Sequence, residues 1–96
     1  PMTVKGAWNC RGHRNTAGTV GRKETIADED ATVIARMRAA GAIPLAFTNI
    51  PEFSLALETD NLLFGRTNNP YDLTRTPGGS GGGGAAAIAA GFSPFE

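Results

Sequence analysis

The sequence predicts an α/β fold, in which a βαβ unit precedes a Gly/Ser-rich loop and an Ala-rich helix. Two observations predict this fold. The first is the order of three patterns along the chain: a β-favouring run at 2–4, a helical pattern that ends at Gly41, and a continuous apolar run at 42–47. This order is typical of parallel strands joined by a helix. Seven of the 13 glycines then lie between Gly78 and Gly91, and an alanine run at 85–90 follows most of them.

The first predicted strand covers Met2-Thr3-Val4 and ends at Lys5, because these residues favour β-structure and are partly apolar. The next residues, 6–22, mix glycine, asparagine, threonine and basic residues without a helical or strand period. We expect a loop there, with a brief strand near Trp8.

The clearest helix is predicted to open at Asp28-Glu29-Asp30. Asp30 can cap free N–H groups, and the three acids suit the positive end of the helix dipole. Gly41 is expected to end the helix as its C′ residue. Four residues recur at helical spacing and predict one apolar face, namely Val33, Ile34, Met37 and Ala40.

The apolar run at 42–47 has the length of a buried parallel strand, although Pro44 fits only at its beginning or on an edge. After a turn, Pro51 is expected at the first position of a short helix. The pattern assigns no structure to 55–63, and turn-forming residues predict an irregular segment over 64–72. Long irregular stretches of this kind are often functional.

The glycine-rich segment 76–84 allows three interpretations. It fits a flexible linker. A phosphate-binding loop is a poor match, because no Lys-Ser or Lys-Thr pair follows and 72–77 is a poor strand. The third interpretation is a catalytic loop that fixes Ser80, since glycines let backbone N–H groups and a helix N-terminus point at one place. The rest of the chain favours it, with these glycines positioning the backbone: Gly78, Gly79, Gly81, Gly82 and Gly83.

Composition excludes several classes of protein. The 96 residues make at most one small domain, and nine basic and nine acidic residues give no net charge. Nothing therefore favours nucleic acid or an anionic membrane as partner. No apolar run could span a bilayer, no signal peptide is visible, and Cys10 alone cannot form an internal disulfide. We expect a cytoplasmic protein, and no pattern indicates its oligomeric state.

Two reactive residues have plainer interpretations. Lys5, at a strand end, is by base rate a solvated surface lysine. His13 lies in a loop, and nothing nearby supplies the second or third ligand of a metal site, so we predict no metal and no cofactor.

Five segments, in the same order, resemble the amidase signature family of serine hydrolases that act on carboxamides. Met2–Lys5 is similar to the strand that ends in that family's catalytic lysine. Asp30–Ala42 resembles its DATV…RAAGA helix and strand, and Thr48–Phe53 resembles its TNxPEF segment. Gly65–Asp72 is similar to GRTNNPYD, and Pro77–Ala87 to PGGSSGGEAA. Any one segment alone is a weak signal, but five in order are specific.

The resemblance implies a Ser–Ser–Lys triad on an α/β fold whose mixed sheet is covered by helices. By position, Lys5 would be the base and Ser80 the bridging serine, which the family holds with a cis peptide bond. The family's nucleophilic serine lies in a later segment similar to DTGGSIR, which is absent here, and Ser93 occupies a different place. The resemblance therefore implies that 1–96 is a partial, N-terminal amidase domain, inactive alone, whose whole protein would act on a small-molecule amide.

The chemistry of such a triad explains its residue types. A serine hydroxyl is a poor nucleophile until a base removes its proton. A lysine accepts that proton only when neutral, and burial or a neighbouring positive charge favours the neutral form. The bridging serine would relay the proton to the lysine and later to the leaving amine.

Three positions depart from the family pattern in ways that count against normal activity, and a fourth, Phe47, departs from it neutrally. Gly81 replaces the usual second loop serine, and Gly84 replaces a usual Glu, which removes an acid from the start of the alanine helix. Gly6 replaces a usual Asp or Glu that would hold the loop, and Phe47 replaces a frequent lysine. We expect the added glycines to loosen the loop.

Two alternatives to a stand-alone amidase stay open. One is the A-type component of an amidotransferase, which acts with glutamine, companion subunits and tRNA. Pro51-Glu52-Phe53 and the segment 66–70 look more similar to stand-alone amidases. The other is a catalytically inactive fragment or scaffold, which the departures favour.

Overall fold

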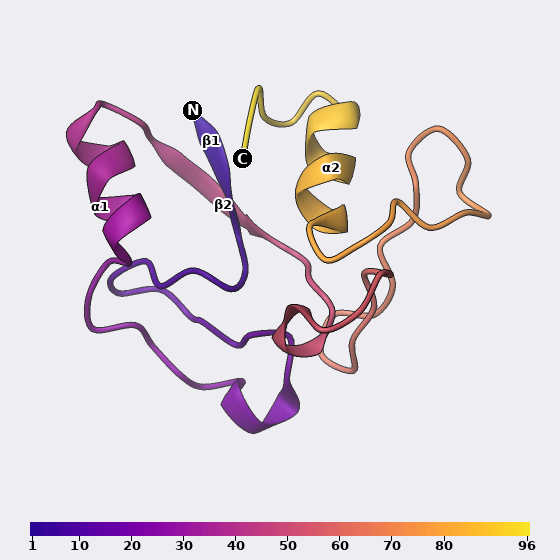
Figure 1. Cartoon of the computed structure of the whole chain (residues 1–96), viewed down its shortest axis with the longest axis horizontal. Helices are drawn as coiled ribbons and strands as arrows, with labels where there is room; N and C mark the ends of the chain where they lie inside the picture. The colour runs from indigo at the N-terminus through magenta and orange to yellow at the C-terminus, as the bar shows by residue number, and fades with distance from the viewer.

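Two short parallel strands lie between two helices (Figure 1). The computed structural model describes all residues from 1 to 96. In chain order its elements are β1 (Met2–Lys5), the 3₁₀ turn η1 (Val20–Arg22), α1 (Thr32–Ala39), β2 (Pro44–Thr48), the 3₁₀ turn η2 (Glu52–Ser54) and α2 (Gly82–Ala89). The predicted α/β fold is confirmed. None of the helices has both the length and the apolar character needed to cross a membrane.

The strand pair carries Lys5 at its end. β1 and β2 are parallel, with Lys5 opposite Thr48, and α1 connects them as the βαβ prediction requires. Pro44 is the first residue of β2, where a missing N–H group is tolerated. On the other edge of β1, the backbone N–H of Thr3 donates to the carbonyl oxygen of Phe95 over 3.1 Å. β1 is therefore held on both sides, and the two chain ends lie close together (Figure 1).

The core is small and buries β1 more completely than β2. β1 is buried along its length, but Leu45 of β2 is 55% exposed, so the prediction of a buried second strand is wrong. The reason is that few residues pack over β2, so that Leu45 and Ala46, on opposite faces of the strand, are both exposed. The core cluster consists of Met2, Val4, Cys10 and Ile34. Large apolar side chains outside it stay exposed, among them Leu55, Leu57, Leu62 and Tyr71.

The start of α1 differs from the prediction. The helix begins at Thr32, its N-cap residue is Ala31, and no side chain caps it. Asp30 instead accepts a hydrogen bond from the backbone N–H of Arg11 over 2.7 Å and lies 3.5 Å from Nε of Arg38. Asp30 therefore connects the preceding loop to the surface of the helix, and the helix opens after the acidic run and not within it.

The apolar face of α1 is narrower than predicted. Ile34 is buried and Met37 packs against the core, whereas Val33 is 43% exposed and Ala40 is exposed. The small core meets α1 along Ile34 and Met37, and Val33, which lies about 100° from Ile34 around the helix axis, stays partly exposed. The predicted C′ role of Gly41 is confirmed by its φ of 90°.

The loop after β1 contains no strand near Trp8. The chain turns there, and the N–H of Trp8 donates to the carbonyl of Lys5 over 3.0 Å. The segment 15–19 is buried, although its sequence has no apolar period, and η1 follows it. Pro51 directly precedes η2 and is not its first residue, which corrects the predicted position.

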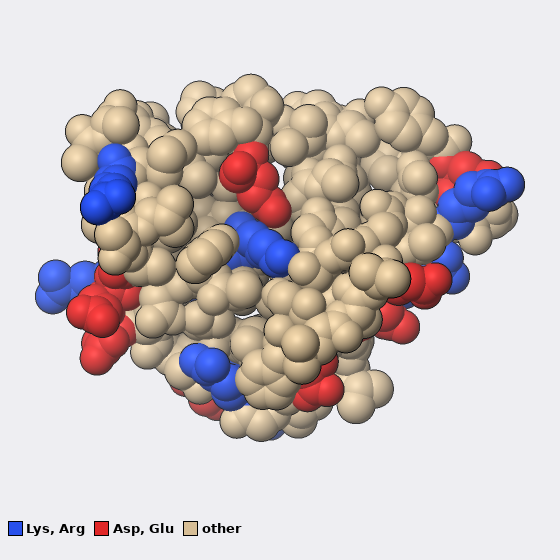
Figure 2. All heavy atoms as spheres, viewed as in Figure 1, with Lys and Arg blue, Asp and Glu red and all other residues tan.

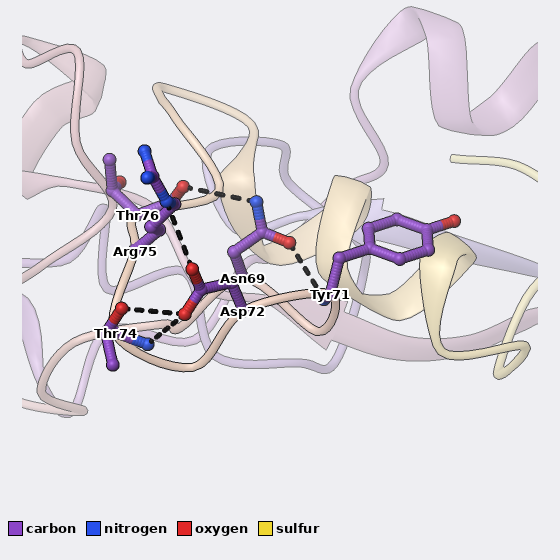
Figure 3. A network of polar contacts seen from close by, with 6 residues as sticks. All are labelled: Asn69, Tyr71, Asp72, Thr74, Arg75 and Thr76. Atoms are coloured by element: carbon purple, nitrogen blue, oxygen red, sulfur yellow. Dashed lines mark hydrogen bonds and ion pairs between the residues drawn. The ribbon is translucent and has the colours of Figure 1, made fainter.

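A hydrogen-bonded turn leads into the glycine segment (Figure 3). Oδ1 of Asn69 accepts from the N–H of Tyr71 over 3.0 Å. Asp72 accepts from the N–H and hydroxyl of Thr74 over 3.0 and 2.7 Å and from Nε of Arg75 over 3.1 Å. The segment is irregular as predicted, but side chains fix its shape.

Acid should loosen this turn. The hydroxyl and then the N–H of Thr74 lower the pKa of Asp72 from its ordinary value of 3.8. A carboxylate with a lowered pKa stabilises the fold above its unfolded pKa, and that contribution is lost as pH falls through the folded pKa. Following the Thr74 amide by NMR from about pH 6 to about pH 2 should give a midpoint below 3.8. Asp72→Asn should abolish the transition, and a midpoint at or above the ordinary value would contradict the assignment.

Candidate active site

Lys5 and Ser80 meet although 75 positions separate them in the chain. Nζ of Lys5 donates to Oγ of Ser80 over 2.7 Å, and both residues are half-buried. Lys5 is the last residue of β1, and Ser80 follows a cis peptide bond between Gly79 and Ser80. The structure thus brings together the two residues that the family resemblance paired, at a distance suitable for proton transfer.

Thr59 holds the glycine loop at two points. Its hydroxyl donates to the carbonyl of Gly78 over 2.8 Å and accepts from the N–H of Gly82 over 3.0 Å, and the residue is only 1% exposed. Gly78 has a φ of 87°, which favours glycine. A Cβ atom at Gly79 would lie 2.8 Å from the carbonyl oxygen of Ala56. Sequence analysis missed Thr59 because it lies within 55–63, where no periodic pattern is visible.

The helix after Ser80 begins earlier than its alanine run predicts. α2 starts at Gly82 and not at Ala85, so Gly82 and Gly83 belong to its first turn and not to the loop. Close packing explains these glycines, because a Cβ atom at position 82 would collide with Thr59 and one at position 83 with the backbone of Asn49. The N–H of Gly83 also donates to the carbonyl of Asn49 over 3.2 Å.

The positions that depart from the family pattern have different surroundings. Gly81 faces open space, so a larger residue would fit there. At Gly6, a Cβ atom would lie 2.7 Å from the carbonyl oxygen of Thr48, which also accepts the Gly6 N–H over 3.1 Å. This strand end therefore closes tightly without an acidic side chain. Phe47 places its ring 5.1 Å from the ring of His13, which is exposed.

Asparagine and threonine side chains form a hydrogen-bond network next to the glycine loop. Nδ2 of Asn61 donates to Oδ1 of Asn49 over 2.6 Å, and Nδ2 of Asn49 donates to Oγ1 of Thr67 over 3.0 Å. The network joins two segments that the resemblance identified, 48–53 and 65–72. Asn61 lies between them and, like Thr59, carried no signal in the sequence.

Ser93 has a structural role, away from the Lys5–Ser80 pair. Its hydroxyl accepts from the N–H of Thr3 over 3.0 Å and donates to the carbonyl of Phe95 over 2.7 Å. The side chain is buried, with 4% exposure, and it fastens the C-terminal segment to β1.

The fold agrees with what comparison with known proteins finds. The Amidase family model matches residues 1–96. The chain belongs to the amidase family. It is 46% identical over 93 residues to Fatty-acid amide hydrolase 2 of Homo sapiens, and the match covers 97% of this chain and 18% of that protein. It is also 47% identical over 95 residues to the A subunit of the glutamyl-tRNA(Gln) amidotransferase of Treponema pallidum (strain Nichols), covering 99% of this chain and 19% of that protein.

Solved structures of the amidase family share this fold. The crystal structure of the glutamyl-tRNA(Gln) amidotransferase A subunit from Thermotoga maritima matches with a TM-score of 0.92 and 36% identity, over 97% of this chain and 21% of that one. The chain spans about a fifth of the length of the curated relatives it matches, 18% and 19% in the two cases above.

The face of the molecule shown in Figure 2 has mixed polarity. Figure 2 shows basic and acidic side chains scattered over one face, without a large patch of one sign. One hollow, of about 550 Å³, is lined by residues of the 6–23 loop and of 47–50 and 63–64, and contains neither Lys5 nor Ser80. A smaller one, about 280 Å³, includes Lys5 and Glu96 in its wall. We regard the chemistry of the Lys5–Ser80 contact, and not the size of either hollow, as the guide to the active site.

Proposed function

We propose that residues 1–96 are part of an amidase domain that hydrolyses non-peptide amide C–N bonds, with Lys5 as base and Ser80 as bridging serine of a Ser–Ser–Lys triad. The observation that carries the proposal is the 2.7 Å contact between Nζ of Lys5 and Oγ of Ser80. Family membership supports the reaction class. The nucleophilic serine and the oxyanion-hole N–H groups come from outside these residues.

In the proposed reaction, the neutral amine of Lys5 accepts the hydroxyl proton of Ser80 as Ser80 accepts the proton of the nucleophilic serine. The nucleophile attacks the amide carbonyl. As the C–N bond breaks, Ser80 gives its proton to the leaving nitrogen and regains one from the ammonium group of Lys5. Water then hydrolyses the acyl-enzyme by the same relay. An amine and a hydroxyl can each donate and accept, so the observed contact serves both directions.

The A-type component of an amidotransferase is the second candidate. The chain is 47% identical to such a protein and 46% identical to a fatty-acid amide hydrolase, so sequence identity does not separate the two. In that case the amide is glutamine, the released ammonia passes to a charged tRNA, and the partners are companion subunits and that tRNA. The similarity of Glu52 and its neighbours, and of 66–70, to stand-alone amidases places this candidate second. A family-derived scaffold without activity is a third.

Ammonia release by the full-length protein distinguishes these functions. We expect hydrolysis of a simple primary amide such as benzamide or a fatty-acid amide without any companion subunit. Glutamine hydrolysis that appears only with companion subunits would favour the amidotransferase. If the protein hydrolyses none of these amides, the result favours the inactive scaffold. Residues 1–96 alone should release no ammonia above background, because they lack the nucleophile.

A further inference from the structure

Glu96 connects the two elements next to the Lys5–Ser80 pair. Its Oε2 accepts a hydrogen bond from the hydroxyl of Thr48 over 2.7 Å, and Thr48 lies opposite Lys5 in the strand pair. The same carboxylate fills the space beside Gly84 in the first turn of α2, where a Cβ atom would collide with it. Much of Glu96 is exposed, but its carboxylate thus lies in a notch between β2 and α2.

A carboxylate at this place complements the charge of α2. The N-terminal end of a helix carries a partial positive charge, which a nearby anion stabilises. The first turn of α2 contains no acidic residue, and Gly82, Gly83 and Gly84 are all buried. The negative charge is supplied by Glu96, which follows the C-terminal end of α2 in the chain, and the missing side chain of Gly84 leaves room for it.

We propose that Glu96 is a positioning residue for the Lys5–Ser80 pair, and this inference rests on the proposed function. Two side-chain connections, in addition to the backbone hydrogen bond from Gly83 to Asn49, join the end of the strands to the start of α2. One is the Lys5–Ser80 hydrogen bond, and the other runs from Thr48 through the carboxylate of Glu96 to Gly84. The second connection sets the spacing that the first one needs. Glu96 has no proposed contact with the reacting atoms.

Single substitutions in the full-length protein test the role. Glu96→Ala should lower kcat for amide hydrolysis about tenfold and leave KM within about twofold, because misplacement of a catalytic pair affects the chemical step. Gly84→Ala should lower kcat similarly, because its methyl group displaces the carboxylate. Its Tm should not fall, since alanine favours a helix more than glycine does. Two controls, Glu29→Ala and Gly21→Ala, change an exposed acid and a glycine without a close neighbour, and should keep wild-type kcat.

Double variants separate positioning from general packing. The Glu96→Ala/Gly84→Ala protein should lose no more activity than either single variant, because each of the two substitutions removes the same contact. Gly84→Glu in the Glu96→Ala background returns a carboxylate to the notch and should restore kcat to within about threefold of wild type. Gly84→Gln in that background has the same size without the charge and should not restore it.

Three results would overturn the role of Glu96, namely wild-type kcat in Glu96→Ala, fully additive losses in the double variant, or equal recovery with Gly84→Glu and Gly84→Gln. Failure of the proposed function looks different, because the wild-type protein itself would then hydrolyse no amide. In that case the Tm values of the Glu96 and Gly84 single and double variants still decide whether the contact exists. A Tm change in the double variant that differs from the sum of the two single changes supports the Glu96–Gly84 contact, and a change equal to that sum refutes it.

Discussion

Ser80→Ala should lower kcat of the full-length protein about 10³-fold, within the 10²–10⁴ range typical of a lost proton-transfer group. Oγ of Ser80 lies 2.7 Å from Nζ of Lys5, and alanine leaves no atom to pass the proton between nucleophile and base. Lys5→Ala should cost a similar factor. The double variant should be scarcely slower than either single one, because residues that act as a unit have strongly non-additive effects.

Lys23→Ala provides the matched control for the lysine, since Lys23 is exposed and has no ion pair with an acid. We expect wild-type kcat from it. Thermal unfolding of every variant separates lost chemistry from lost folding. Rates within about threefold of wild type in both Ser80→Ala and Lys5→Ala would refute the assigned roles.

Sequence reasoning could predict the parts of the site that local chemistry specifies. The β-favouring run before Lys5, the C′ position of Gly41 and the first-residue position of Pro44 each follow from backbone preferences, and the structure confirms all three. The pairing of Lys5 with Ser80 does not follow from local preference, because 75 positions separate them. Only the family resemblance put them together.

The missed features depend on contacts between distant segments. Asp30 has the chemistry of a helix cap, but its carboxylate binds the backbone N–H of Arg11 and the guanidinium group of Arg38 instead of the first N–H groups of α1. The hydroxyl of Thr59 is ordinary in sequence and becomes important only because both ends of the glycine loop reach it. Likewise, alanines predict where a helix is favoured locally, but tertiary hydrogen bonds and packing start α2 within the glycines.

Gly83→Ala should have the largest effect on stability of any single methyl addition in the glycine segment. The added Cβ atom would collide with the backbone N, C and O atoms of Asn49, which have no freedom to rotate away. Overpacking of this kind typically costs about 1–3 kcal/mol, and we expect the upper half of that range in the free energy of unfolding. The strain lies close to Ser80 in the chain, so kcat should fall as well.

The atoms that the added Cβ would meet allow a control for this prediction. Because backbone atoms cause the collision, Asn49→Gly in the Gly83→Ala background should not restore stability. At Gly82 the colliding atoms belong to the side chain of Thr59, so Thr59→Ala should relieve part of the strain caused by Gly82→Ala. Gly21→Ala, which meets only ordinary van der Waals contact, should not destabilise the protein. A Gly83→Ala protein as stable as wild type by thermal unfolding would show that α2 and Asn49 are not packed this closely.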